Sequence, residues 1–428
     1  MVVRRLLPIL LLLCCALALA PAAAQAKRGA CIVGATGPGC EVWKAKVLDV
    51  GDGDTFDVDV ANDGTTRTRR IRFTGVQAME LSSYAARHRL GDCHAVQATE
   101  RVEQLVRRAK GRVRLAAEDP LSMSGHRLRR IVAVRSGGRW TDVGTLLVRE
   151  GLALWWPTWT ESAPNPTYSV LAQEARAAGR GIYDPDACGV GPSAASPLKL
   201  WVNWDADGRD TSNAAGEWVK IRNLDPVNAV PLGGWYVRDS GLRRFTFPAN
   251  AVVGPGATVT VNVGEESDGV SVFAWNQRAP VFGNASEDAD VMGDGAYLFD
   301  PLGNIRASMI YPCRFNCTDP LQGAITIGAD PDGRRESVTL TNVSAGPVDL
   351  DGYVLKSVPQ SYHFGQGSVI QPGGSLVIRV LGDPSQDTAT VKRWGFARTI
   401  LRNAGDVVEL RTYTDIRLAC TAWGDRSC

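Results

Sequence analysis

The sequence of 428 residues predicts a multidomain protein, in which a small α+β barrel is followed by two all-β units. Three observations lead to this fold class. Residues 43–185 alternate β-patterned runs with amphipathic helices, helical periodicity nearly vanishes after residue 197, and the last half repeats itself at an offset of 119 residues. The chain is also longer than one hydrophobic core normally serves, so several domains are expected.

The first 26 residues have the order of a secretory signal peptide. Arg4 and Arg5 precede the apolar run LLPILLLLCCALALA, and small residues follow up to Ala26. We therefore predict a signal peptide over 1–26 and a secreted, extracellular mature protein. No later stretch reaches the roughly 18 apolar residues of a membrane span, so no transmembrane segment is expected.

Eight cysteines remain after the leader, an even number that favours disulfides in an exported chain. Their spacing predicts a small Cys31–Cys40 loop and a long Cys93–Cys188 bond within one domain. The last four cysteines allow local or crossed pairing, and their spacing does not decide between these. Too few histidines stand near cysteine pairs to favour zinc.

The barrel elements follow from residue patterning. An Asn-Asp-Gly turn at 62–64 separates two β-patterned runs, and VQATERVEQLVRRAK has the spacing of an amphipathic helix. Gly179 and Gly181 end a later helix. The expected strands are 43–60, 67–77, 111–117 and 128–134, and the expected helices are 96–110, 143–150 and 168–179.

The second half of the chain contains two copies of one pattern. EWVKIRN (217–223) is similar to ESVTLTN (336–342), and GPGATVTVNVG (254–264) is similar to QPGGSLVIRVLG (371–382). PLGGWYV and GDGAYLFD have the partners DLDGYVL and AGDVVELR. Each copy of about 110 residues has the size of a sandwich domain.

The Gly, Pro, Ser and Ala residues of 186–197 predict a linker. Residues 27–190 hold 24 Lys and Arg against 19 Asp and Glu, whereas 191–428 hold 21 against 26. A basic first half favours an anionic partner, although an excess of this size does not establish nucleic-acid binding.

Residues 43–185 resemble the staphylococcal (micrococcal) nuclease family. The resemblance covers about 140 residues, through DGDTF (52–56), RIRFTGVQAMEL (70–81), LLVREGLAL (146–154) and EARAAGRGIYD (174–184). It implies a five-stranded OB-type barrel with three helices. It also implies calcium-dependent hydrolysis of phosphodiester bonds in DNA or RNA.

Residues 198–313 and 320–428 each resemble the lamin-tail domain, an immunoglobulin-like sandwich. GEWVKIRN, LGGWYVRD, RFTFP and GDGAYLFD carry the match in the first copy, and the second is more divergent. These two domains are expected to tether or target the protein through a surface or a protein partner.

The DGDT stretch supplies the expected cation ligands. Calcium prefers several oxygen ligands with carboxylates among them, so Asp54 is a candidate ligand and Asp52 a ligand or helper. Arg72 can offer a planar fork to phosphate, and Glu80 can activate or orient water. The resemblance implies the same roles for Asp54, Arg72 and Glu80. Read alone, DGDT is also a common turn.

Two positions depart from the nuclease pattern. Gln77 stands where the family has an aspartate that binds calcium. A unit charge interaction at about 4 Å is worth roughly 4 kcal/mol at an effective dielectric near 20, so its loss predicts a calcium site weakened by two or three decades. The second phosphate-binding arginine falls on Arg127, or on His126 if the stretch has no bulge.

Several other residues have a structural interpretation as well as a functional one. Arg69, Arg70 and Arg72 form a basic strand that fits a solvated edge face as well as phosphate contact. His88 and His94 are more typical of exposed loops than of metal ligands. The loop 286–295 is expected to be a plain loop. Trp155, Trp156 and Trp159 are expected to pack rather than to stack on bases, and Trp235 and Tyr353 are expected core residues. A solvated face is the expected role of five basic residues assigned to the long helix and its end: Arg107, Arg108, Lys110, Arg112 and Arg114.

The sequence thus favours an exported nuclease-like protein that acts on nucleic acid with calcium. Two alternatives stay open: a barrel that binds nucleic acid with weakened or lost turnover, and an extracellular scaffold that only contacts proteins.

Overall fold

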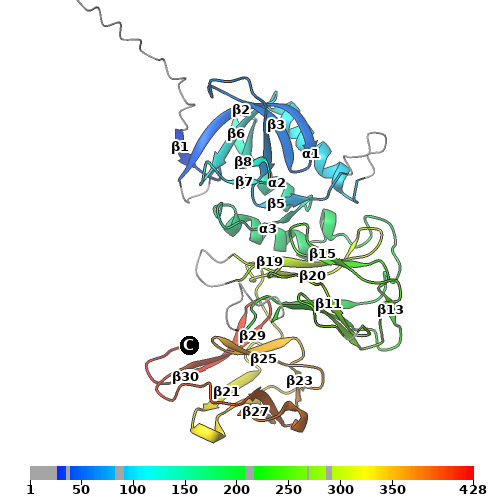
Figure 1. Cartoon of the computed structure of the whole chain (residues 1–428), viewed down its shortest axis with the longest axis vertical. Coiled ribbons are helices and arrows are strands. Elements are labelled where there is room, and N and C mark those ends of the chain that lie inside the picture. The colour runs from blue at the N-terminus through cyan, green and yellow to red at the C-terminus, as the bar shows by residue number, and fades with distance from the viewer. Residues whose placement is uncertain (1–26, 35–38, 82–90, 208–215, 268, 286–291) are drawn as a thin grey trace, which may run out of the picture.

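The computed structural model describes residues 27–34, 39–81, 91–207, 216–267, 269–285 and 292–428. The predicted signal peptide, His88 and most of the loop 286–295 lie outside the described residues. Three bodies follow one another along the long axis in chain order, with the barrel at one end (Figure 1). Among the described residues, no helix has the length and apolar character needed to cross a membrane.

Five strands of the first body close into a ring. β2 pairs with β3, β3 with β4, β4 with β8, β8 with β6, and β6 returns to β2; only β4 and β8 run parallel. Phe56, Ile71 and Val132 are among the side chains that fill the interior. The strands are β1 Lys27–Ala30, β2 Gly39–Asp52, β3 Thr55–Val60, β4 Arg69–Phe73, β5 Val76–Ala78, β6 Arg112–Ala117, β7 Met123–Ser124, β8 Arg127–Ser136, β9 Arg139–Asp142 and β10 Ala153–Trp155.

Two expected strands are each divided in two. The 43–60 run breaks at Gly53-Asp54 into β2 and β3, which pair as a hairpin, so DGDT is a turn between strands. The 67–77 run breaks at Thr74-Gly75 into β4 and β5, because Gly75 takes a positive φ of 78° that extended strands do not adopt. Arg112 and Arg114 lie on β6 and not on the helix or its end, which corrects that assignment.

Three helices cover the barrel close to their expected bounds: α1 Ala95–Arg108, α2 Val143–Arg149 and α3 Asn165–Ala177, followed by the 3-10 turn η1 Gly181–Tyr183. Asp142 caps α2 by accepting a hydrogen bond from the Thr145 backbone N–H at 2.6 Å, and it also accepts one from the Tyr168 hydroxyl at 2.6 Å. Gly144 is required here, since an added Cβ would lie 2.2 Å from that hydroxyl.

The two sandwiches share one strand pairing pattern, which confirms the internal repeat. In the first, the sheets are β11-β12-β17-β18, β13-β16 and β15-β14-β19-β20. In the second, they are β21-β22-β27-β28, β23-β26 and β25-β24-β29-β30. Trp235 is buried in the first core, as expected, whereas Tyr353 is half-buried and donates its hydroxyl hydrogen to Asp319.

The bounds in the first sandwich are β11 Leu198–Asn203, β12 Trp218–Asn223, β13 Val230–Pro231, β14 Tyr236–Arg238, β15 Arg244–Thr246, β16 Val252–Val253, β17 Thr258–Asn262, β18 Val272–Ala274, β19 Asp294–Phe299 and β20 Ile305–Tyr311. Those in the second are β21 Ile325–Asp330, η4 Gly333–Arg335, β22 Ser337–Asn342, β23 Val348–Asp349, β24 Tyr353–Ser357, β25 Gln360–His363, β26 Val369–Ile370, β27 Ser375–Leu381, η5 Pro384–Gln386, β28 Val391–Phe396, β29 Val407–Thr412 and β30 Arg417–Ala422.

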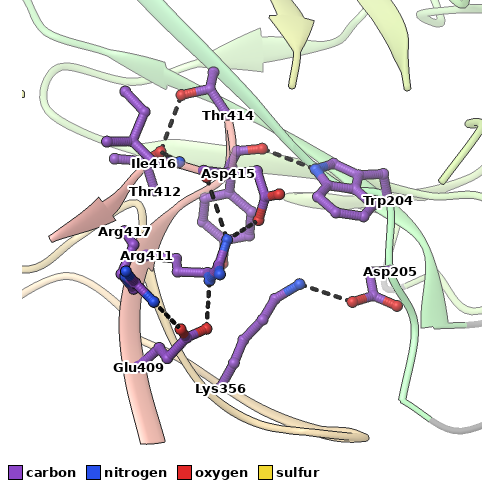
Figure 2. Close-up of polar contacts among 11 residues, drawn as sticks. Trp204, Asp205, Lys356, Glu409, Arg411, Thr412, Thr414, Asp415, Ile416 and Arg417 are labelled. Carbon is purple, nitrogen blue, oxygen red and sulfur yellow. Dashed lines mark hydrogen bonds and ion pairs between the residues drawn. The ribbon is translucent and has the colours of Figure 1, made fainter. Parts of the chain in front are cut away.

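Polar contacts join the two sandwiches (Figure 2). The Trp204 indole donates to the Tyr413 carbonyl oxygen at 2.8 Å, and Lys356 pairs with Asp205 at 2.7 Å. Nearby, Arg411 lies between Glu409 and Asp415, at 2.6 and 2.8 Å. The second sandwich is therefore held against the first by specific bonds as well as by its connecting chain.

The barrel contacts the first sandwich through α3. Gln173 accepts from the Arg314 backbone N–H at 2.7 Å and donates to the Pro312 carbonyl oxygen at 2.8 Å. Arg176 donates to Ser308 on β20, also at 2.8 Å. The predicted linker lies against the same sandwich, since Asn304 donates to the Gly189 carbonyl oxygen at 3.0 Å.

Four disulfides pair all eight cysteines of the described residues. Cys31–Cys40 and Cys93–Cys188 confirm the two bonds expected from spacing. The remaining cysteines pair locally, as Cys313–Cys317 and Cys420–Cys428.

Replacing Cys93 and Cys188 together with serine is expected to lower the free energy of unfolding of the barrel by about 2–4 kcal/mol, because the bond closes a long loop. Its sequence separation is 95 residues, against 4 for the control Cys313→Ser/Cys317→Ser. Urea unfolding monitored by circular dichroism measures the unfolding free energy of both variants. A loss in the control as large as in the Cys93/Cys188 variant would contradict the loop-closure explanation.

Candidate phosphodiester site

The DGDT turn is fixed against helix α1 and strand β5. The Asp52 carboxylate accepts a hydrogen bond from the Asp54 backbone N–H at 2.9 Å, which closes the turn locally. At Gly53 an added Cβ would lie 2.6 Å from the Ala98 Cβ and 2.8 Å from the Ala78 Cβ. The glycine therefore allows the turn to approach both elements, and this places Asp54 inside the barrel mouth.

Asp54 is buried and fully engaged. Its Oδ1 lies 2.7 Å from Arg72 Nη1 and accepts from the Thr55 hydroxyl at 3.0 Å, while its Oδ2 accepts from the Ala78 backbone N–H at 2.8 Å. Burial raises the pKa of Asp54, the nearby Asp52 carboxylate adds to the rise, and the Arg72 guanidinium opposes it.

The Gln77 side chain joins the three residues of the predicted site. Its Oε1 accepts from Arg72 Nη2, and its Nε2 donates to the Ala78 carbonyl oxygen at 3.0 Å and to Glu80 Oε1 at 2.7 Å. Asp54, Arg72 and Glu80 thus converge on one side of the barrel, although they lie far apart in the sequence. Their catalytic and metal-binding roles stay predictions.

Arg72 is enclosed rather than open to a ligand. Its side chain is 2% exposed, and its guanidinium lies 5.1 Å from the centre of the Trp156 ring. Arg129 approaches the same ring at 5.3 Å. Trp156 therefore packs against cations, and the phosphate contact expected of Arg72 stays a prediction. Trp155 is buried and also packs, whereas the expected packing of Trp159 is wrong, because this side chain is 65% exposed.

Arg127 and His126 are the two candidates for the second phosphate contact. Gly125 and His126 form the turn between the paired strands β7 and β8, and His126 is exposed there. Arg127 begins β8 and donates to the Thr55 hydroxyl at 3.2 Å, which links it to Asp54. The arrangement favours Arg127 over His126.

The first sandwich contributes a residue that no sequence motif indicated. Arg238 of β14 is buried, with Nη1 3.9 Å from Met79 Sδ and Nη2 donating to the Gly241 carbonyl oxygen. Its positive charge lowers the pKa of Glu80, but burial outweighs this effect and raises that pKa overall. Because Arg238 lies 158 positions after Glu80, only the packing of the two bodies brings it here.

The two neighbouring surface arginines are paired with acids. Arg70 contacts Asp57 through two bonds of 2.9 and 3.0 Å, and Arg69 lies 3.9 Å from Asp63. Arg70 and Arg72 lie on the same face of β4, but Arg70 pairs with Asp57 at the surface, whereas Arg72 is enclosed with Asp54 and Gln77. The solvated strand face is therefore the observed arrangement for Arg69 and Arg70.

The donor set in this arrangement does not fit calcium, which takes about six to eight oxygen ligands. The Asp54 oxygens are occupied by Arg72, Thr55 and Ala78, and the Gln77 amide hydrogens occupy the Ala78 carbonyl and a Glu80 oxygen. Within the described ranges, the only cluster of three or more His, Cys, Asp or Glu donors is Cys93, His94 and Cys188. That cluster contains a disulfide, and none of the predicted calcium ligands belongs to it.

Two tandem sandwiches with the same strand pairing define a repeated domain of one type. The family model described as Lamin Tail Domain matches residues 202–312 and 324–424, so the second half of the chain consists of two lamin tail domains. No curated protein matches the chain.

Replacing Arg72 with Met is expected to cost about 3–5 kcal/mol of unfolding free energy at pH 8 and less at pH 5, because it leaves Asp54 buried without its cation. Losing Arg72 raises the pKa of Asp54 further above its value in the unfolded chain. The folded state then retains a proton that the unfolded chain releases, so stability falls as pH rises. The midpoints of urea unfolding at pH 8 and pH 5 measure this loss of stability.

The matched control for this variant is Arg70→Met, whose ion pair is exposed and contributes at most about 1 kcal/mol. If Arg72→Met lowers the unfolding free energy equally at pH 8 and pH 5, the buried Asp54 carboxylate is not the cause of the loss.

Proposed function

We propose that the barrel is a nucleic-acid-binding domain on a staphylococcal-nuclease-like, OB-type scaffold, with strongly reduced calcium-dependent hydrolysis. One observation carries the proposal: the Gln77 amide joins Arg72, the Ala78 carbonyl and Glu80 in a closed network around Asp54. The network has the acidic and basic groups of a phosphodiester site, and hydrogen bonds and an ion pair hold these groups together without a metal ion.

Charge balance supports this conclusion. Phosphodiester hydrolysis needs positive charge near the phosphate and an activated water. Here the amide hydrogens of Gln77 already satisfy the Ala78 carbonyl and Glu80, so a cation has to break these bonds before it reaches the oxygens. With an amide where the nuclease pattern has a carboxylate, one negative charge is also lost.

Glu80 is the residue best placed to act on water. Its side chain is exposed at the edge of the network, and partial desolvation, together with the nearby Asp52 carboxylate, raises its pKa. A carboxylate with a raised pKa is a better proton acceptor than an ordinary one. Its link to Gln77 at 2.7 Å fixes its direction.

We further propose that the protein is secreted and that its lamin tail domains attach the barrel to a surface or a protein partner. The leader-like residues 1–26 and four disulfides are typical of an exported chain. The bonds between barrel, first sandwich and second sandwich support the view that the three bodies act as one unit.

The Gln77→Asp substitution is expected to increase calcium-dependent cleavage of single-stranded DNA at least tenfold, because it returns a carboxylate to the network. Calcium is also expected to raise the melting temperature of this variant by several degrees, because it neutralises the added charge. Nucleotide release and thermal unfolding are followed during a calcium titration of the purified mature protein.

Gln77→Asn keeps the amide and is the matched control, with no expected gain in either readout. Gln77→Asp/Glu80→Gln should keep the calcium-dependent rise in melting temperature and lose cleavage. Wild-type cleavage as fast as that of Gln77→Asp would instead establish a fully active calcium-dependent nuclease. Absence of any DNA binding would leave an extracellular scaffold.

A further inference from the structure

A basic groove lies on the barrel wall, and it shares no lining residue with the network around Gln77. Its volume is about 500 Å³, within the range of small-molecule sites. Its lining combines four cations, one acid, one aromatic ring and small apolar side chains. The lining residues are Lys44, Ala45, Lys46, Asp59, Ala61, Arg112, Val113, Arg135 and Trp140.

Strand register builds this groove across neighbouring strands. Lys46 of β2 lies opposite Arg112 of β6 on one side and Asp59 of β3 on the other. Arg135 of β8 lies opposite Trp140 of β9. Lys44 and Lys46 are two positions apart on one strand and therefore share a face, so β2, β6 and β8 present their cations together.

The groove cations differ from the other arginines of the barrel. Lys44, Lys46, Arg112 and Arg135 are all exposed, and none of them forms an ion pair with a described acid. Asp59 is the one acid of the lining, so the groove has a net charge of +3 when these groups are ionised.

Several other basic residues of the barrel are engaged with acids. Arg101 binds Glu150 through bonds of 2.8 and 2.5 Å, and Arg72 is enclosed with Asp54. The groove gathers four exposed cations around one hollow, so it can offer them together to one anionic ligand. Trp140 is half-buried beside it, so its ring is held by the strand and still partly accessible.

We propose that this groove binds single-stranded nucleic acid, with phosphates on the four cations and one base stacked on Trp140. A positive groove that contains an aromatic ring is the arrangement that proteins use for single strands, because an unpaired base exposes its face. The cations alone would hold any polyanion, whereas the ring gives a preference for bases. The inference rests on the proposed nucleic-acid binding and adds its location and strand type.

The first test is fluorescence anisotropy with a labelled dT12 oligonucleotide at several salt concentrations. Lys44→Glu/Lys46→Glu is expected to weaken binding at least tenfold and to reduce the salt slope by about 1.4, since each lost phosphate contact contributes roughly 0.7 for a single strand. The matched control, Arg334→Glu/Arg398→Glu, makes the same charge change at exposed positions of the second lamin tail domain and should bind like wild type.

The second test separates base stacking from charge. Trp140→Ala is expected to weaken dT12 binding severalfold and to leave binding of inorganic polyphosphate unchanged, while Trp140→Phe retains most dT12 binding. Circular dichroism checks that each variant is folded. If a Trp140 variant does not fold, Lys44→Glu/Lys46→Glu tests the groove in its place. Equal effects of Trp140→Ala on both probes, or none on either, would establish a general polyanion surface and overturn the proposal.

Two further outcomes separate this inference from the proposed function. If wild type binds dT12 and Lys44→Glu/Lys46→Glu binds equally well, the groove proposal fails while nucleic-acid binding stands. If wild type does not bind dT12 at all, both proposals fail.

Discussion

The buried ion pair between Asp54 and Arg72 is the interaction on which the barrel mouth depends. Asp54 belongs to the turn after β2, Arg72 to β4, and the Ala78 N–H that bonds Asp54 to β5. A buried charge without a partner is costly, so these elements keep their relative positions. The same requirement encloses Arg72, whose side chain is buried beside Asp54.

The environment of the site extends beyond the barrel. Arg238 of the first lamin tail domain lies beside Met79 and affects the ionisation of Glu80, while Gln173 and Arg176 of α3 hold that domain in place. The lamin tail domain therefore does more than follow the barrel in the chain. Its Arg238 is one of the charges that lower the pKa of Glu80, after the larger effects of burial, Asp52 and Arg72.

The arginines and lysines of the barrel serve three different purposes. Some, such as Arg72, neutralise buried acids, others, such as Arg70, pair with acids on the surface, and those of the basic groove are exposed without an acidic partner. Net charge alone does not separate these uses, because each residue counts equally toward the total. The surroundings of each side chain separate them, since burial and the position of a neighbouring acid decide whether a cation is enclosed, paired or exposed.

The sequence by itself determined the order of the domains, the internal repeat, the helices and two of the disulfides, because periodicity, turn residues and cysteine spacing are local signals. It also indicated that Asp54, Arg72 and Glu80 belong together. It did not reveal that Gln77 bridges them, that Arg238 lies beside Met79, or that Lys46 and Arg112 share a groove. Only the tertiary structure decided these, because each depends on side-chain direction and on contacts between segments that are distant along the chain.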